Sequence, residues 1–376
     1  MSFAEPLIAR SRRLRNTPFT TRVEASGVQA YTVYNHMLLP TRFRGLEEDY
    51  WHLRKSVQIW DVACERQVQI KGPDAAKLAQ MLTVRDIRKY DVGRCGYAPV
   101  CDDDGLLIND PVLLRVAADC YWFSISDSDV MLWAGGIARS LGLDVEISEP
   151  DVNPLAVQGP LANDLMAEVF GAAVREIKFF RFVPMRFKGH EMFVARSGWS
   201  AQGGFEIYVN DWQLGGELYD ALTAAGEKYD VGPGCPNLIE RIEAGLLTYG
   251  TDVTRKHTAL EAGLAKYCSL DAGTDAIGLE ALRVQRDRGL TRRGCGFTIS
   301  GQRVPAQRDP WPLIIGGKQV GSVTSAVWSP RLNTNVSLGM IAIDHVAPGT
   351  KAMVVTSAGE RIATVSEVPF PGAAQR

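Results

Sequence analysis

The chain has 376 residues, of which 46% are hydrophobic and 22% charged, and its formal net charge is −2. A chain of this length can bury more than one hydrophobic core, so we expect two or three domains. The near-neutral charge gives no electrostatic reason to expect nucleic acid or an anionic membrane as a partner. No apolar stretch approaches the roughly 18 residues that span a bilayer, and no signal sequence is recognisable, so we expect a cytoplasmic protein.

The seven cysteines are scattered and odd in number, which is typical of a reducing compartment. None of them forms a Cys-x-x-Cys pair, and the five histidines lack the spacing of a zinc-binding helix. We therefore expect no structural or catalytic metal.

Two stretches of the chain repeat one pattern, a short apolar strand followed by Gly-Pro and a helix. The first runs from Val68 to Leu82 and the second from Leu155 to Val169. In each, the proline stands at the expected helix start, where its missing N–H would be unpaired anyway, and apolar residues recur at helical spacing. The pattern predicts an internal duplication, and two related lobes commonly bind a ligand at their junction.

After the first repeat, the segment from Cys95 to Asp110 has two strand-like runs around an acidic turn. It predicts a hairpin whose second strand ends at Asn109-Asp110. Taken alone, Asp110 is best interpreted as a turn residue at a strand end. Its place after the first repeat corresponds to that of Glu206 after the second, which makes both acids candidates for the junction.

Glu206 belongs to a second hairpin, in which the apolar runs Met192 to Ala195 and Phe205 to Val209 predict two strands. The glycine-rich loop between them lets the backbone turn or approach a ligand closely. Alternation points Glu206 away from its two apolar neighbours, and a carboxylate inside an apolar strand needs a hydrogen-bonding partner. That partner is an internal arginine if Glu206 is structural, or a ligand if the junction is a binding site.

The pattern changes in the last third of the chain. A helix is predicted from Pro236 to Gly250, where glycine terminates it. Beyond about residue 283, short strands alternate with turns, and Gly316-Gly317 is the expected hairpin turn of a small antiparallel barrel or sandwich. The strand candidates are Gly296 to Ser300, Leu313 to Ile315, Gln319 to Ala326, Val336 to Ile343, Lys351 to Thr356 and Ile362 to Val368.

Several motifs follow one another over nearly the full chain. They are the strand-Gly-Pro-helix unit, Asn109-Asp110, Arg196-Ser-Gly-Trp-Ser-Ala-Gln-Gly-Gly-Phe-Glu-Ile207, Arg241-Ile-Glu-Ala-Gly-Leu-Leu-Thr-Tyr-Gly-Thr-Asp252, Glu261-Ala-Gly-Leu264 and Gly321-Ser-Val-Thr-Ser-Ala-Val-Trp-Ser-Pro330. Together they resemble the glycine-cleavage T-protein family of tetrahydrofolate-dependent enzymes.

The resemblance implies an α+β fold, a three-domain cloverleaf with two pseudo-symmetric α/β lobes around a central folate channel and a C-terminal antiparallel β-barrel. Residues 1–283 would form the two interleaved lobes with the folate and substrate site, and residues 284–376 the barrel. It also implies tetrahydrofolate as co-substrate, and a homodimer is one option for the assembly.

Within the family, four motifs are similar to those of the dimethylsulfoniopropionate demethylases. They are Ala30-Tyr-Thr-Val-Tyr-Asn-His-Met37, Trp60-Asp-Val-Ala-Cys-Glu-Arg66, Ser197-Gly-Trp-Ser200 and Gly234-Cys-Pro-Asn-Leu-Ile-Glu-Arg241. Aminomethyltransferases usually have Thr-Gly-Tyr-Thr-Gly-Glu-Asp-Gly where this chain has Ser197-Gly-Trp-Ser-Ala-Gln-Gly-Gly204. This departure argues against a role in glycine cleavage.

The resemblance also implies roles for individual residues. Glu206 would hydrogen-bond the pterin ring and Asp110 would lie near the reactive nitrogens. Trp199 would sit by the substrate with Tyr208. The catalytic candidates are Asp110, Tyr208 and Trp199, and the folate-binding candidates are Tyr97, Ser124, Glu206, Tyr208, Asp110 and Arg241. Without the resemblance, the two tyrosines and the serine are interpreted as strand residues, and the tryptophan as a loop plug.

The expected substrate is a small sulfonium compound. A sulfonium methyl is activated by its neutral thioether leaving group, so the enzyme mainly holds donor and acceptor in line, which can supply roughly 7–11 kcal/mol of the barrier. Aromatic faces at Trp199 and Tyr208 would hold the cation by about 0.5–2 kcal/mol each, without a carboxylate that stabilises the ground state too well. Two alternatives stay open: methyl or aminomethyl transfer from an amine, and a folate-binding protein without turnover.

Overall fold

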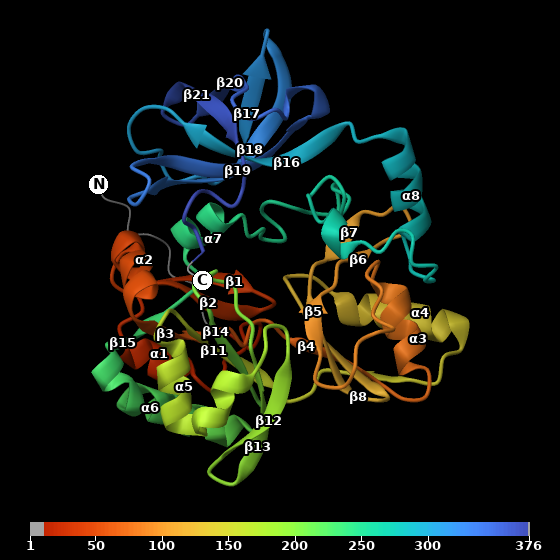
Figure 1. Ribbon diagram of the computed structural model, residues 1–376, viewed down its shortest axis with the longest axis vertical. Helices are drawn as coiled ribbons and strands as arrows, with labels where there is room; N and C mark the ends of the chain where they lie inside the picture. Colours follow the sequence, from red (N-terminus) through yellow and green to blue (C-terminus); the bar gives the residue numbers. More distant parts are fainter. Residues whose placement is uncertain (1–10, 375–376) are drawn as a thin grey trace.

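The computed structural model describes residues 11–374. Two lobes of mixed helix and strand lie side by side, and a β-barrel lies above them in the view of Figure 1. Among the described residues, no helix combines the length and apolar character needed to cross a membrane.

The first lobe is a five-stranded antiparallel sheet covered on one face by two helices. Its elements are β4 (Gln67–Lys71), α3 (Ala75–Leu82), β5 (Cys95–Tyr97), β8 (Val112–Ala117), β9 (Cys120–Ser124), α4 (Val130–Leu141) and β10 (Glu146–Ser148). The strand order is β10-β4-β9-β8-β5. The apolar stripe of α3, including Leu78 and Leu82, is fully buried with Ile70 and Phe123 of the sheet, as an amphipathic helix on a sheet requires. A small hairpin of β6 (Val100–Cys101) and β7 (Leu107–Asn109) extends from this lobe.

The second lobe is a six-stranded sheet in the order β12-β13-β14-β11-β3-β15, in which only the β15–β3 pair is parallel. Its elements are β3 (Val57–Asp61), β11 (Asn153–Gln158), α5 (Ala162–Phe170), η1 (Ala172–Glu176), β12 (Phe182–Phe187), β13 (His190–Ala195), β14 (Gly204–Val209), α6 (Trp212–Gly226), η2 (Glu227–Tyr229) and β15 (Val231–Gly234). Strand β3 precedes the whole first lobe in the chain, so the two lobes are interleaved. The N-terminal elements α1 (Thr20–Ala25), β1 (Ala30–Tyr34), β2 (Met37–Arg42) and α2 (Leu46–Lys55) pack beside this lobe.

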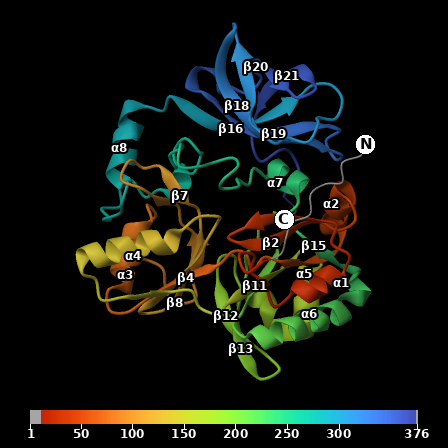
Figure 2. The ribbon, with the colours of Figure 1, turned by 180° about the vertical axis from the view of Figure 1, so that it is seen from behind.

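The two sheets meet through an apolar cluster that contains Trp122 of the first lobe and Phe182 and Tyr208 of the second. Backbone hydrogen bonds across the junction, such as that from Cys95 N to the Phe180 carbonyl at 3.1 Å, hold the two edges together. Because side chains alternate along β14, Phe205 and Ile207 pack into the helix-covered core, and the intervening residues face the junction. The two helix layers lie on the outer sides of the lobes (Figure 2).

The C-terminal body is a closed six-stranded barrel in the order β16-β19-β18-β17-β20-β21. Its strands are β16 (Arg292–Ile299), β17 (Trp311–Ile315), β18 (Lys318–Ser329), β19 (Thr334–Ala342), β20 (Lys351–Thr356) and β21 (Gly359–Ser366). Phe297, Leu313 and Val354 fill its interior with no solvent exposure. Closure leaves no free sheet edge.

The connection between lobes and barrel contains α7 (Leu238–Ala244), η3 (Ala265–Tyr267) and α8 (Leu279–Arg288), and η4 (Ile343–His345) follows β19. Figures 1 and 2 show α7 between the second lobe and the barrel. The expected domain boundary near residue 283 falls within α8.

The structure confirms the expected α+β fold with two lobes and an antiparallel barrel, and each of the six barrel strands overlaps its predicted range, with ends that differ by up to four residues. The repeated unit is present as β4–α3 and β11–α5. In both copies the glycine before proline has positive φ, +135° at Gly72 and +123° at Gly159, and an added Cβ would lie 2.7 and 2.5 Å from a carbonyl oxygen. Each helix begins two residues after its proline, slightly later than predicted.

The prediction of one helix up to Gly250 is wrong. Helix α7 ends at Ala244 because Gly245 takes the left-handed conformation, with φ of +69°, and its N–H reaches back to the Ile242 carbonyl. This is a glycine C-cap, the same signal that the sequence offers at Gly250.

Candidate active site

Glu206 lies on β14 at the junction of the lobes and is only 8% exposed. Its carboxylate accepts a hydrogen bond from the Ser197 hydroxyl, at the start of the glycine-rich loop. Burial raises the pKa of Glu206, and the hydroxyl groups of Ser197 and Tyr208 partly offset the effect. The buried acid is therefore held by neutral donors, and no arginine of residues 11–374 forms an ion pair with it, as the structural interpretation would have required.

Tyr208, two residues further along β14, is 1% exposed and connects the two lobes. Its pKa is raised well above its usual range, mainly by burial and then by Glu206, while a hydrogen bond with Ser124 opposes the shift. Ser124 belongs to β9 of the first lobe, where its hydroxyl accepts from Gln67 Nε2 at 3.0 Å. Glu206, Tyr208 and Ser124, three folate-site candidates, thus come together.

Asp110 forms a second group, just beyond strand β7. It is 7% exposed and accepts hydrogen bonds from the Tyr97 hydroxyl, at 2.7 Å, and from Ser126. Burial raises the pKa of Asp110 to about 6, although both hydrogen bonds favour its charged form. Asn109 holds Ser126 in place, since its side chain bonds both the N–H and the carbonyl of Ser126 at 3.0 Å.

Tyr97 is fixed on its far side as well. Its ring lies 4.7 Å from that of Tyr267, and the Arg85 guanidinium donates to the Tyr97 carbonyl at 2.7 Å. The pKa of Tyr97 is raised well above its usual range by burial and by Asp110, so this hydroxyl is a donor to the acid. Asp110 is consequently about half protonated near pH 6. A group with such a pKa is suited to hydrogen bonding or to proton transfer at neutral pH.

Two residues of the same site were not predicted from the sequence, namely Tyr34 and Glu65. Burial, Asp110 and Glu65 raise the pKa of Tyr34, and a hydrogen bond with Ser126 opposes the rise. Burial, Glu206 and Asp110 raise the pKa of Glu65. The two acidic groups are therefore parts of one site, with Glu65 close to both. The available signal was the position of Glu65 inside the motif from Trp60 to Arg66.

Trp199 lies in the loop between β13 and β14 and is half-buried. Among the described residues, it belongs to neither of the two hydrogen-bonded groups. The loop is anchored by Ser200, which donates to Gln158 at 2.7 Å. Two of its glycines lie close to neighbouring protein atoms, because an added Cβ would lie 2.2 Å from Gln158 at Gly198 and 2.3 Å from the Val157 carbonyl at Gly204, whereas Gly203 has no atom within 4 Å of that position. The role of Trp199 beside the substrate stays a prediction.

Arg241 on α7 makes a buried ion pair with Asp252, at 2.6 Å, and donates to Ser325 of the barrel at 2.6 Å. Ser325 and Thr324 also donate to Asp252, so the guanidinium and the acid join α7 to strand β18. This joint lies near the acids, since Asp252 contributes to the raised pKa of Asp110. The structure places Arg241 in a barrel joint, and its predicted contact with folate stays untested.

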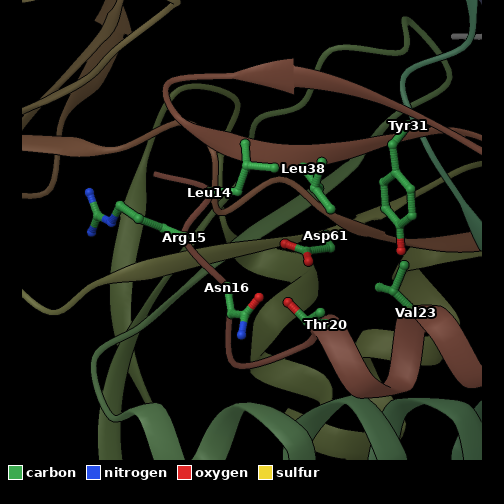
Figure 3. A pocket seen from close by; sticks show the side chains of 8 residues that line it. All are labelled: Leu14, Arg15, Asn16, Thr20, Val23, Tyr31, Leu38 and Asp61. Carbon is green, nitrogen blue, oxygen red and sulfur yellow. The ribbon is translucent and has the colours of Figure 1, made fainter. Parts of the chain in front are cut away.

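A small pocket beside Asp61 has a volume of about 20 Å³ and lies under the N-terminal segment (Figure 3). Such a volume holds about one water molecule. Burial raises the pKa of Asp61 to about 6, opposed by hydrogen bonds from Thr17 and the Ala63 N–H. This pocket is too small for folate and contains none of the predicted site residues.

Comparison with known proteins identifies the family. Residues 19–272 match the GCVT N-terminal domain and residues 292–371 the glycine cleavage T-protein C-terminal barrel domain. The chain therefore belongs to the glycine cleavage T-protein family, as its motifs predicted.

Individual relatives give a more specific comparison than the family models. The dimethylsulfoniopropionate demethylase DmdA of Ruegeria pomeroyi is 53% identical over 357 residues, which cover 95% of this chain and 97% of that protein. An aminomethyltransferase of Symbiobacterium thermophilum is 29% identical over 88% of this chain and 91% of its own length. The crystal structure of the glycine cleavage system aminomethyltransferase T from Bartonella henselae superposes with a TM-score of 0.84 at 21% identity, covering 95% of this chain and 98% of that one. This last likeness supports the fold alone.

Proposed function

We propose that the protein transfers a methyl group from dimethylsulfoniopropionate to tetrahydrofolate, giving methyltetrahydrofolate and 3-methylthiopropionate. The observation that carries the proposal is the 53% identity to the Ruegeria pomeroyi demethylase over almost the whole of both chains. As a member of the T-protein family, the chain is an enzyme that uses tetrahydrofolate as co-substrate.

The residues at the junction fit a folate. A pterin ring presents N–H donors, and Glu206 is a buried acceptor whose hydrogen bonds come from neutral hydroxyl groups. Glu206 would accept from the pterin, and Tyr208 and Ser124 would fix its edge. Tyr97, held by Asp110 and Tyr267, would line the channel.

Tetrahydrofolate supplies a ring nitrogen whose lone pair attacks the sulfonium methyl in line. The S–CH₃ bond breaks with its electron pair on sulfur, and the N–H proton of the nitrogen is released. The chain's own residues orient the two substrates and exclude water from the junction. Asp110, with its pKa of about 6, would take up or relay the released proton.

The direct test is anaerobic incubation with tetrahydrofolate and dimethylsulfoniopropionate, followed by mass spectrometry of both products. Stoichiometric formation that is lost in Glu206→Ala and Trp199→Ala supports the proposal and its site. Matched controls are Glu191→Ala on the neighbouring strand and Trp212→Ala on α6, both exposed positions, which should retain turnover.

A second candidate is methyl or aminomethyl transfer from an amine, which the aminomethyltransferase relatives favour. It predicts tight folate binding with no turnover of the sulfonium compound and turnover of an amine donor. Folate binding without turnover of any donor would favour a binding protein instead.

We further propose a cytoplasmic location, which the seven free cysteines support. A homodimer stays a prediction that sedimentation velocity tests.

A further inference from the structure

Glu65 is held at the turn between β3 and β4 by its backbone. Its N–H donates to the Val62 carbonyl at 2.9 Å, and its own carbonyl accepts from Gln67 Nε2 at 2.8 Å. The adjacent Cys64 carbonyl accepts from Asn35 Nδ2 at 3.0 Å. The turn is thereby tied to Asn35, next to Tyr34, and to Gln67, the partner of Ser124.

The side chain of Glu65 is half-buried among the groups of the site. Glu206, from the second lobe, and Asp110, from the first, are the two charged groups that act on it, and it acts in turn on Tyr34. The hydrogen bonds of the turn place Glu65 between Gln67, the partner of Ser124, and Asn35, which also donates to the Ser126 carbonyl at 3.1 Å. Burial and the two other acids raise the pKa of Glu65, and a bound cation would oppose that rise and favour the ionised carboxylate.

Glu65, Asp110 and Glu206 have no basic partner among the described side chains. Among residues 11–374, no lysine or arginine forms an ion pair with Glu65, Asp110 or Glu206, although most other buried acids of the described chain have such a partner, as Asp252 and Glu243 do. Gln67, which is fully buried, adds an oxygen, Oε1, with no hydrogen-bond donor in the described part of the chain. The site thus has more hydrogen-bond acceptors than donors, and its acids have no basic partner in the described part of the chain. Such a site favours a positively charged ligand.

We propose that Glu65 recognises the positive charge of the methyl donor and selects an onium cation over a neutral compound of the same shape. The inference rests on the proposed function and names a residue for its substrate specificity. It also revises the expectation that aromatic faces alone hold the sulfonium.

The reaction explains why such a carboxylate does not merely stabilise the ground state. As the S–CH₃ bond breaks, the electron pair moves to sulfur, and positive charge passes through the methyl carbon to the attacking nitrogen. Because both lobes contribute carboxylates to the site, the positive charge stays near a carboxylate as it moves from sulfur to nitrogen. The carboxylates therefore stabilise the transition state as well as the bound substrate. The thioether product is neutral at sulfur and loses the attraction, which favours its release.

The test compares Glu65→Gln with the wild type by calorimetric titration of two ligands. These are dimethylsulfoniopropionate and 4-methylpentanoate, in which an uncharged CH replaces the sulfonium sulfur. We expect the Kd of the cation to rise about tenfold or more, as for the loss of a charge-assisted contact. The Kd values of 4-methylpentanoate and tetrahydrofolate should stay within about twofold of the wild type. Glu176→Gln, an exposed carboxylate on η1, is the matched control and should change nothing.

An equal loss for both ligands would make Glu65 a structural residue and overturn the inference, and so would no change for either. Glu65→Asp keeps the charge and should restore selectivity for the cation, which provides a second variant if the glutamine variant folds poorly. If the wild type binds folate but not the sulfonium compound, the proposed function fails. Trimethylglycine then tests Glu65 separately: its binding should weaken selectively in Glu65→Gln, and absence of any onium binding would overturn the inference.

Discussion

Asp110→Asn should make the protein more stable and less active. Burial raises the pKa of Asp110 from 3.8 to about 6, even with hydrogen bonds from Tyr97 and Ser126. Two pKa units correspond to about 3 kcal/mol at roughly 1.4 kcal/mol each, which is the order of the cost of ionising this group in the folded protein. Asparagine has nearly the same shape and does not ionise.

The pH dependence follows from the sign of the shift. Between about pH 4 and 6 the folded chain binds a proton that the unfolded chain has released, so stability falls as pH rises through this window. The variant lacks this loss. Its advantage over the wild type should be about half of the ionisation cost at pH 5, roughly 1.5 kcal/mol, approach about 3 kcal/mol by pH 8, and accompany a fall in methyl transfer of about 100-fold, the usual contribution of a general acid–base group.

The assay is thermal and urea unfolding of both proteins from pH 5 to 8, with Asp103→Asn as a control. Asp103 lies in the same hairpin but is exposed, so its variant should follow the wild type. If Asp110→Asn is less stable than the wild type at pH 8, the hydrogen bonds outweigh burial and the reasoning fails.

Three further predictions concern the acids and the barrel joint. Glu206→Gln should raise the Kd for tetrahydrofolate about 10- to 100-fold, because an amide is a weaker acceptor than a carboxylate, and an unchanged Kd in calorimetry would contradict its role. Asp252→Ala leaves Arg241 buried without its acid and should cost about 3–5 kcal/mol, measured by urea unfolding, whereas an unaltered melting temperature would refute the importance of the joint. Asp61→Asn should gain stability above pH 6 with no change in turnover, since the pKa of Asp61 is raised to about 6 outside the site; a loss of turnover would argue against that placement.

Local patterns were sufficient for most of the fold. The barrel strands alternate apolar and polar residues between clear turns, and the duplicated Gly-Pro units have the same backbone conformation at Gly72 and Gly159. The end of α7 was misplaced because two glycines, Gly245 and Gly250, offer the same C-cap signal, and only the tertiary structure selects between them.

The residues of the site also differ in how far the sequence alone predicts them. Glu206 and Asp110 are visible in the sequence because a carboxylate in or beside an apolar strand is unusual. Glu65 and Tyr34 lie within motifs of the sequence, but no local pattern assigns them to the site, since that relation depends on contacts between distant segments, such as the bond from Asn35 to Ser126, 91 residues apart. The glycines of the Trp199 loop were predicted to let the backbone turn or approach a ligand closely; Gly198 and Gly204 lie close to Gln158 and the Val157 carbonyl, and an approach to a ligand stays a prediction.

The most direct test of the central claim follows the methyl group itself. Dimethylsulfoniopropionate with deuterated methyl groups is incubated with tetrahydrofolate and the enzyme without oxygen, and both products are analysed by mass spectrometry. The account predicts methyltetrahydrofolate that carries one fully deuterated methyl group, in equal amount to 3-methylthiopropionate that retains the other. Methyltetrahydrofolate without the label, or labelled substrate that is bound but unchanged, would contradict it.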